Sequence, residues 1–358
     1  MHIEKAAYFF RITGKPVSCI SYGHGHINHT FLVTTDTGNE YILQKINKYV
    51  FKDPVKVMAN ASAVTNYIRE RIDDPRKVLH FITSLQGRYY YRDDQGEFWR
   101  MYDYAVGFCL DAPESPEDFY QSALAFGNFQ HMLSDFPAET LYETIPEFHN
   151  TVDRYRLLKE AIQADNVGRV KEAQPEIAYA LSMEEFCAKL QKMKEAGQLP
   201  LRVTHNDTKL NNVLLDKVTR KSLCVLDLDT VMPGLSVHDF GDAIRFGAAT
   251  AAEDDPIPAN MKLDLEMYRV FTKGFLETAP ELTEQEIRML PYGALIITME
   301  IGIRFLKDFL DGDLYFRTAY PEHNLVRART QLALAADMQK KWEEMVRIVE
   351  ETAAAVRK

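Results

Sequence analysis

The chain has 358 residues, of which 46% are hydrophobic and 26% are charged, values that indicate a globular protein with one large or two medium domains. Its formal net charge of −10 at pH 7 disfavours general nucleic-acid binding, although a metal-lined pocket on an acidic protein can still hold an anionic ligand. The four cysteines have no CxxC spacing, so we expect reduced thiols and no structural zinc site. The N-terminus lacks the apolar segment of a signal peptide, and the most apolar run, Gly293–Met299, is too short to cross a membrane. We therefore expect a cytoplasmic protein without membrane or nucleic-acid partners, and a monomer.

The first hundred residues predict an antiparallel sheet with one inserted helix. A short helix over 1–14 ends at a glycine and a proline, and apolar residues at helical spacing predict a longer helix over Pro54–Arg71. Alternating apolar and polar residues predict strands over Val17–Tyr22, Asn28–Thr35, Glu40–Ile46, Leu79–Leu85, Arg88–Arg92 and Glu97–Tyr104. Hairpin turns are expected at Asp36–Asn39 and Asp93–Gly96.

The remainder predicts mostly helices. They are expected over Pro116–Leu133, Asp153–Ala164, Ile177–Ala196, Met261–Glu277, Thr283–Asp311 and His323–Val356. A break is expected near Pro291, and Leu201–Asp242 predicts short strands and loops. A β-rich front followed by a helical back favours an α+β fold with two lobes, 1–103 and 104–358, and a ligand cleft between them.

The segment Val203–Asp242 concentrates Asp, Asn and His beside apolar runs. His205, Asp207 and Asn212 match the pattern H-x-D-x-x-x-x-N, and Asp227 follows at the end of an apolar strand. In phosphoryl transfer, one carboxylate must accept or orient the proton of the attacking hydroxyl, and an amide and a second carboxylate hold the metal. Such oxygen ligands suit Mg²⁺. The segment therefore predicts a phosphotransfer site with Asp207 as the base and Asn212 and Asp227 as metal ligands.

Neighbouring polar residues have less certain roles in the pattern. Lys209 can place a cation against the transferring phosphoryl group, whose charge builds on its equatorial oxygens. Asp229 is either a second metal ligand or only a neighbour of the site. His205 is expected to pack and hydrogen-bond within the loop, and Asp239 and Asp242 to hold the loop through hydrogen bonds.

At these residues the chain resembles the aminoglycoside phosphotransferase and choline kinase-like superfamily, and within it the N-acetylhexosamine 1-kinase family. The resemblance spans nearly the whole chain. It is carried by YGHGHIN (Tyr22–Asn28), YILQKIN (Tyr41–Asn47), THNDTKLNNVL (Thr204–Leu214), LDLDTVMPGL (Leu226–Leu235), DFGDAIRFGA (Asp239–Ala248) and IRFLKDFLDGDLYF (Ile303–Phe316). The catalytic-loop string is common to the superfamily, whereas GHIN, DTVMPG and RFL…GDLYF are far more specific and carry the sugar 1-kinase assignment.

The resemblance implies a bilobal protein-kinase-like fold. It implies an enzyme that uses ATP and Mg²⁺ to phosphorylate the anomeric hydroxyl of N-acetylglucosamine or N-acetylgalactosamine. It assigns the base to Asp207 and a metal ligand to Asp227. It also implies substrate contacts from His26, Asn28, Arg304 and Tyr315. The alternatives are a surface or ion-pair role for Arg304, a core position for Tyr315 and a turn position for His26.

The nucleotide-binding residues depart from the protein-kinase pattern. Strand alternation sends Gln44, and not Lys45, to the face where a phosphate-binding lysine is expected, so Lys45 would need a bulge to reach it. The glycine turn at Gly23 and Gly25 is too short for a full G-x-G-x-x-G, but its backbone could still approach phosphate. The segment Met101, Tyr102, Asp103 and Tyr104 is the expected hinge, with backbone groups that bind adenine.

Two other interpretations stay open. A kinase of choline, ethanolamine, homoserine, methylthioribose or an aminoglycoside would share the catalytic residues. A cationic acceptor among these would need carboxylates, which the tail offers at Glu300, Asp308, Asp311 and Asp313. A non-catalytic, pseudokinase-like binding module is disfavoured because Asp207, Asn212 and Asp227 are all present.

Overall fold

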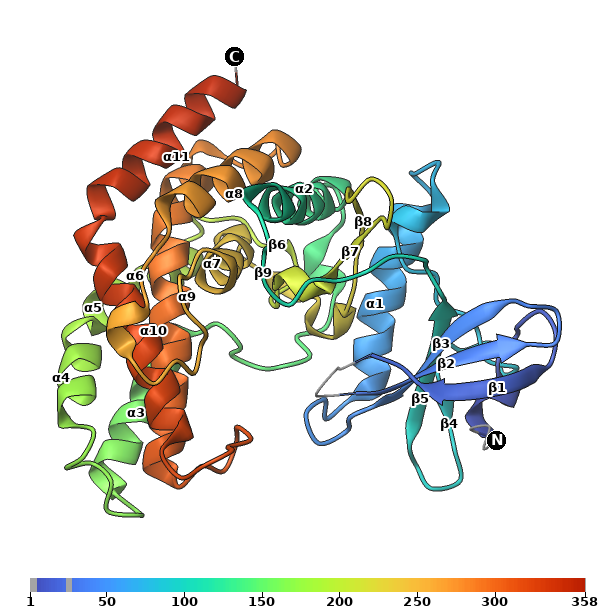
Figure 1. Ribbon diagram of the computed structural model, residues 1–358, viewed down its shortest axis with the longest axis horizontal. Coiled ribbons are helices and arrows are strands. Elements are labelled where there is room, and N and C mark those ends of the chain that lie inside the picture. Colours follow the sequence, from blue (N-terminus) through green and yellow to red (C-terminus); the bar gives the residue numbers. More distant parts are fainter. Residues whose placement is uncertain (1–4, 24–27, 358) are drawn as a thin grey trace. The chain divides into compact units, whose positions relative to one another are not determined.

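A computed structural model describes residues 5–23 and 28–357 (Figure 1). Its N-terminal part contains an antiparallel sheet and its C-terminal part is mainly helical, which confirms the predicted α+β class. The chain forms two compact units. The first contains the chain up to Cys109 with Met132–Pro146 and Asn212–Pro233, and the second contains Leu110–His131, Glu147–Asn211 and the chain from Gly234 onward. The predicted lobe boundary at 103/104 stays a prediction.

The first unit is built on a five-stranded antiparallel sheet with the order β1-β2-β3-β5-β4 (Figure 1). Its strands are β1 (Pro16–Ser21), β2 (His29–Thr35), β3 (Glu40–Ile46), β4 (Tyr91–Arg92) and β5 (Phe98–Asp103). Val33, Leu43 and Met101 are fully buried in a core on one face of this sheet. Helix α1 (Pro54–Arg69) lies in the same unit, and the side chain of Asp53 caps it by accepting a hydrogen bond from the Lys56 N–H.

Two predictions about the first unit are wrong in detail. The predicted strand Leu79–Leu85 makes only isolated bridges, from Phe81 to β5 and from Ser84 to Phe10, because its backbone meets two different partners at single points and forms no ladder. The predicted helix over 1–14 is a short 3-10 helix, η1 (Lys5–Phe9), within the described residues.

The first unit also contains a two-stranded antiparallel ladder, β7 (Val213–Leu215) with β8 (Ser222–Val225). The 3-10 helix η5 (Leu228–Thr230) follows it. Phe108 exchanges backbone hydrogen bonds with Leu215, at 3.0 and 2.8 Å, which ties this ladder to the segment after β5.

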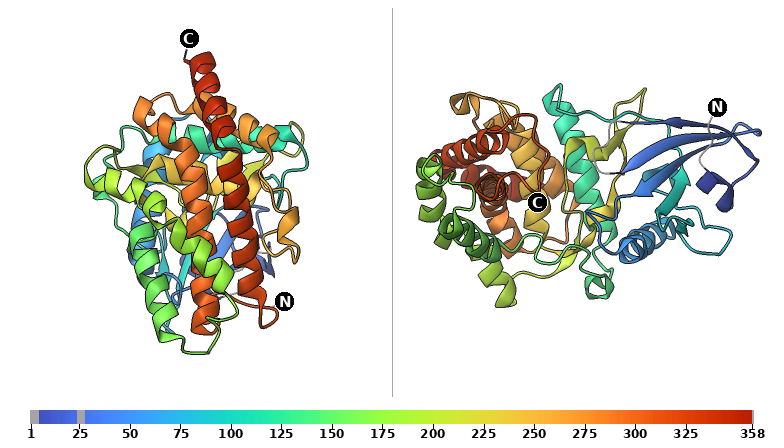
Figure 2. Two further views of the ribbon diagram at one scale, coloured as in Figure 1. Left: turned by 90° about the vertical axis from the view of Figure 1, so that its left-hand side faces the viewer. Right: turned by 90° about the horizontal axis from the view of Figure 1, so that it is seen from below.

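The second unit contains most of the helices. They are α2 (Pro116–Met132), α3 (Thr151–Ala164), α4 (Gln174–Ser182), α5 (Glu184–Cys187), α6 (Lys189–Glu195), α7 (Ser236–Gly247), α8 (Leu265–Thr278), α9 (Glu284–Asp311), α10 (His323–Lys340) and α11 (Trp342–Val356). Helix α9 is central and packs against α3, α7, α10 and α11 (Figure 2). It is long and apolar enough to cross a membrane, yet 83% of its most apolar window is buried inside the unit, as in a core helix.

Three predictions about these helices are corrected. The helix expected over Ile177–Ala196 is divided into α4, α5 and α6, because α3 side chains bind carbonyl groups within it. Tyr155 donates to Ala180 O at 2.9 Å, and Thr151 donates to Cys187 O at 2.7 Å. Helix α9 continues through Pro291 without a break, with buried packing on both sides of the proline. The helix expected over His323–Val356 is two helices that meet at Lys341.

The most consequential correction concerns residues 236–242, where loops and short strands were predicted and the first part of α7 is found. Nearly every residue of α7 is buried, including Asp239, Asp242 and Arg245. Val237, Phe240 and Ile244 have the spacing of a helix, but the Asp and Gly residues between them favour turns, and the loop prediction follows those residues.

Candidate active site

The predicted catalytic loop lies in the second unit, between strand β6 (Arg202–Thr204) and the 3-10 helix η4 (Leu210–Asn212). His205 is fully buried, with its ring 5.5 and 6.0 Å from the rings of Phe126 and Phe129. Its Nδ1 accepts a hydrogen bond from the Asp207 N–H at 3.3 Å. As predicted, His205 therefore packs and orders the loop, and it is too deeply buried to act on a substrate.

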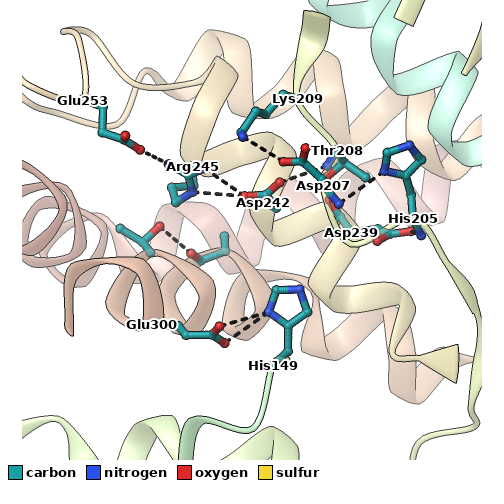
Figure 3. A network of polar contacts seen from close by, with 12 residues as sticks. His149, His205, Asp207, Thr208, Lys209, Asp239, Asp242, Arg245, Glu253 and Glu300 are labelled. Carbon is teal, nitrogen blue, oxygen red and sulfur yellow. Dashed lines mark hydrogen bonds and ion pairs between the residues drawn. The ribbon is translucent and has the colours of Figure 1, made fainter. Parts of the chain in front are cut away.

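Two carboxylates of α7 hold this loop from behind (Figure 3). Asp239 accepts hydrogen bonds from the N–H groups of His205 and Asn206, at 2.9 and 2.7 Å, and Asp242 accepts from the Thr208 N–H at 2.9 Å. Burial raises the pKa of Asp239, and the hydrogen bonds from these N–H groups and from the Gln130 amide oppose that rise. As predicted, both residues support the loop, so the backbone on either side of Asp207 is fixed.

Asp207 itself is half-buried and forms an ion pair with Lys209 at 2.9 Å (Figure 3). The carboxylate of Asp207 is the main cause of a raised pKa of Lys209, which keeps the ammonium charged. Asp242 in turn pairs with the buried Arg245 at 3.0 Å, and Arg245 reaches Glu253 at 2.8 Å. The second unit thus presents a carboxylate that can accept a proton, beside a cation that can face developing negative charge.

The predicted metal ligands Asn212 and Asp227 lie together in the first unit. They flank β7 and β8, where Leu226 N–H donates to Asn212 O at 2.7 Å. An amide oxygen and a carboxylate are hard ligands that fit Mg²⁺. Within the part of the chain that the structure describes, no three His, Cys, Asp or Glu side chains are grouped to hold a metal. A bound Mg²⁺ would therefore depend on phosphate oxygens as well as on these two residues.

The partners of Asp229 favour its role as a neighbour of the site over its role as a second metal ligand. Its side chain is 2% exposed, and one carboxylate oxygen pairs with Arg100 while the other accepts from Asn28 Nδ2 at 2.7 Å. Asn28, for which a substrate contact was predicted, also accepts a hydrogen bond from the Asn47 N–H at 3.0 Å. Both side chains are thus engaged within the first unit.

The predicted nucleotide-binding residues fall into two groups. Gln44 and Lys45 lie on opposite faces of β3, with Gln44 opposite Arg100 and Lys45 opposite Trp99 in the ladder. No bulge recruits Lys45 to the Gln44 face, so strand alternation is confirmed here.

The hinge and turn residues form the second group. Met101 is fully buried, and the Asp103 and Tyr104 N–H groups already donate to His80 O and Glu40 O. Tyr102 is paired with Ile42 in the ladder, and adenine binding by this segment stays a prediction. Gly23 has a positive φ of 75° and starts the predicted turn, whereas Gly25 and His26 lie outside the described residues.

Arg304 and Tyr315 are brought together in the second unit. The Arg304 guanidinium lies 5.6, 5.8 and 5.5 Å from the ring centres of Phe148, Tyr315 and Phe316. Tyr315 is 68% exposed, so it is not a core residue. The half-buried guanidinium and the accessible ring form a surface that can pack on a sugar and donate hydrogen bonds to it.

A model of the phosphotransferase enzyme family matches residues 18–270. The chain belongs to this family. It is similar to the solved structure of a microcompartment-associated aminopropanol kinase, with a TM-score of 0.67 and 17% identity over 95% of this chain and 97% of that one. It is also similar to an amicoumacin kinase in complex with AMP-PNP, Ca²⁺ and Ami, with a TM-score of 0.63 and 15% identity over 92% and 91%. It is also similar to a choline kinase from Cryptosporidium parvum Iowa II, with a TM-score of 0.56 and 13% identity over 95% of this chain and 94% of that one. The predicted protein-kinase-like fold is confirmed.

Several residues of this phosphotransferase site have no signal in a single sequence. Arg100 lies in an ordinary strand pattern, and its partner Asp229 is 129 positions away. Asp308 and Asn324 order the loop that carries Tyr315, but their contacts also join separate elements. Such pairs become visible only when the fold brings distant elements together.

Proposed function

We propose that this phosphotransferase transfers the γ-phosphoryl group of ATP to the anomeric hydroxyl of an N-acetylhexosamine. The observation that supports the reaction best is the accessible Asp207 carboxylate beside Lys209, on a loop fixed from behind by Asp239 and Asp242. Family membership supports phosphoryl transfer, and the resemblance of the flanking strings supports the anomeric hydroxyl.

The roles of the residues follow from their chemistry. Asp207 accepts or orients the proton of the acceptor hydroxyl, and Lys209 stabilises charge on the transferring group. Asn212 and Asp227 would hold Mg²⁺, which supplies neutralisation of the phosphate charge when bound. The amicoumacin kinase structure contains AMP-PNP and Ca²⁺, which supports a nucleotide and a divalent metal in this fold.

The state of the tail carboxylates supports a neutral acceptor. Glu300 is fully buried against His149 at 3.2 Å, and Asp308 accepts from the Tyr315 and Phe316 N–H groups. The other two are paired as well, Asp311 with Lys307 and Asp313 with Arg169. All four of these tail carboxylates are thus engaged, whereas the Arg304 guanidinium lies among aromatic rings beside an exposed tyrosine.

A kinase of an amino alcohol is the second candidate, and one cavity favours it. This cavity, of about 660 Å³, lies in the second unit and includes Arg245, which contacts Asp242 behind the catalytic loop. Its acidic lining residues are Asp111, Glu114, Glu253, Asp264 and Glu266. A surplus of carboxylates suits a cationic acceptor, and two of the similar structures are named as aminopropanol and choline kinases.

An acceptor panel distinguishes the candidates. Purified protein is incubated with ATP and Mg²⁺ and with free sugars, N-acetylhexosamines or amino alcohols, and ADP release is measured. The proposal expects turnover with N-acetylglucosamine or N-acetylgalactosamine and a product whose phosphate is acid-labile and alkali-stable. Turnover confined to choline, ethanolamine or aminopropanol would establish the second candidate and refute the first.

The role of Asp207 is tested by Asp207→Asn. Loss of the proton acceptor is expected to lower kcat by about 10²–10⁴-fold, because that is the usual share of general acid–base catalysis. Nucleotide affinity, measured by calorimetry, should stay within a few-fold of the wild-type value. Asp216→Asn, on an exposed turn of the chain, is the control and should keep normal turnover. A near-normal rate for Asp207→Asn would remove this residue from the base role.

A further inference from the structure

One face of the sheet in the first unit carries a row of polar side chains from three neighbouring strands. Thr30 on β2, Gln44 on β3 and Arg100 on β5 lie opposite one another in the ladder. Gln44 Nε2 donates to Thr30 Oγ1 at 2.9 Å, and Arg100 Nε donates to Gln44 Oε1 at 2.8 Å. The Gln44 amide is held at both ends and therefore fixes the position of the Arg100 guanidinium.

Arg100 continues this row to the segment that follows β8. Its Nη1 donates to Asp229 Oδ1, and both side chains are 2% exposed. Asp229 Oδ2 accepts from Asn28, which completes a network around the carboxylate. Burial alone would lower the pKa of Arg100, but the charges of Asp229 and Asp227 outweigh burial. The pKa is therefore raised, and the guanidinium stays charged. A buried ion pair of this kind is costly to break, because the remaining charge is left without a partner.

The pair acts on a strained piece of backbone. Asp227, two residues before Asp229, has a φ of 50°, a left-handed conformation that a residue with a side chain seldom adopts. Such conformations persist where surrounding contacts over-determine them. Here Arg100 holds Asp229, and Asn60 Nδ2 on α1 donates to Val231 O at 2.9 Å. The turn is therefore fixed from two sides just after Asp227.

We propose that Arg100 is a positioning residue for the metal ligand Asp227, and that Asp229 serves this pairing and binds no metal. The inference rests on the metal site of the proposed function and adds residues to it that no sequence pattern indicates. Lys45 follows Gln44 on β3, but it lies on the opposite face of the strand and takes no part. The fixed charge behind the metal-binding turn is thus an arginine from β5.

Binding measurements without any acceptor test this role. Affinity for AMP-PNP is measured by calorimetry in Mg²⁺ and again in EDTA. For Arg100→Gln we expect the Kd in Mg²⁺ to rise at least tenfold and the Kd in EDTA to change less than threefold. Arg100→Lys, which keeps the charge, should recover most of the loss. Arg92→Gln is the matched control, because Arg92 is an exposed arginine on β4 of the same sheet, and it should change neither Kd by more than twofold.

A second measurement addresses Asp229 directly. Mn²⁺ bound per protein–AMP-PNP complex is counted by electron paramagnetic resonance. Asp229→Asn should keep the wild-type number of bound ions, whereas Asp227→Asn should lose one. Loss of an ion in Asp229→Asn, or an unchanged Mg²⁺-dependent affinity in Arg100→Gln, overturns the proposal.

A double variant, Arg100→Gln with Asp229→Asn, replaces the ion pair by two neutral amides and tests whether misfolding explains a loss of affinity. This variant leaves no buried charge without a partner, so its melting temperature should approach that of the wild type. Its amides hold the turn less firmly, and we expect the Kd in Mg²⁺ to stay at least fivefold weaker. Wild-type affinity in this variant would show that Arg100 is structural only. Because no acceptor is present, a chain inactive on N-acetylhexosamines would refute the proposed acceptor and leave this test unaffected.

Discussion

Asp308 shows how a buried carboxylate can shape the surface that we propose for the acceptor. It lies one helical turn after Arg304 on α9 and is 4% exposed. Its two oxygens accept from the N–H groups of Tyr315 and Phe316, each at 2.8 Å, and Asn324 adds a third donor at 2.9 Å. The carboxylate therefore fixes the loop after α9 to the helix by hydrogen bonds. This places the rings of Tyr315 and Phe316 beside the Arg304 guanidinium.

Asp308→Asn tests the hydrogen bonds that fix this loop. The amide keeps one acceptor oxygen and presents a donor to an N–H group, so we expect a loss of about 2 kcal/mol in unfolding free energy, typical of hydrogen bonds to a charged group. The acceptor KM should rise about tenfold, while kcat changes less than threefold because Asp207 and its loop are untouched. Steady-state kinetics with the acceptor identified in the panel measure both quantities.

The matched control is Asp311→Asn, three residues further along the same helix. Among the described residues, Asp311 pairs only with Lys307 one turn earlier, and such a helical pair contributes no more than about 0.5 kcal/mol. Its KM should stay near the wild-type value. Equal KM values in the two variants would mean that the loop does not form part of the acceptor site.

At the scale of elements, the contact of α7 with α9 supports the catalytic loop. The two helices approach so closely that a Cβ on Gly241 would lie 2.3 Å from Gly293 O, and a Cβ on Gly293 would lie 2.1 Å from Val237 O. These contacts are with backbone, which cannot move aside as a side chain can. The glycines thus allow α7 to lie against the core helix, where its Asp239 and Asp242 reach the loop.

Gly293→Ala should separate the two helices. Although alanine favours a helix by about 1 kcal/mol over glycine, overpacking against backbone costs about 1–3 kcal/mol or more. We expect chemical denaturation to show a net loss of about 2 kcal/mol in unfolding free energy. We also expect a lower kcat, because the loop that Asp239 and Asp242 hold would move with α7. Gly302→Ala on the same helix is the control, since its nearest neighbour is a Leu332 side-chain methyl group at 3.1 Å. Comparable losses in both variants would contradict a specific role for the α7 contact.

The limits of sequence interpretation are clearest at this scale. Asp207, Asn212 and Asp227 could be predicted because their chemistry depends on short spacings along the chain, and the strand alternation of Gln44 and Lys45 is equally local. Helix α7 was not predicted, although Val237, Phe240 and Ile244 have helical spacing, because the Asp and Gly residues between them favour turns. The partner of Arg100 could not be found, since no local pattern joins residues 129 positions apart.

At the scale of the whole molecule, buried charge makes stability depend on pH. His238 on α7 is buried, with its ring 4.9 Å from that of His149. Burial, and then the positive charges of His149 and Lys194, hold the pKa of His238 well below 6.5. The buried acids Glu286 and Glu300 differ, because hydrogen bonds and cations outweigh burial and lower their pKa from 4.5. They lose their stabilising effect only as the pH falls below about 4.5.

The window between pH 6.5 and 4.5 therefore separates the contribution of His238 from that of the two glutamates. There the unfolded chain binds a proton at His238 that the folded protein does not, so stability must fall as the pH falls, by up to about 1.4 kcal/mol per pH unit for one proton. His238→Gln cannot take up a proton, and its unfolding free energy should decline less steeply across this window. Asp239, whose pKa is raised by burial, affects both proteins alike and cancels in the comparison. The exposed His131→Gln is the control and should follow the wild type. Parallel curves for His238→Gln and wild type, from urea denaturation at several pH values, would show that His238 is protonated in the folded protein.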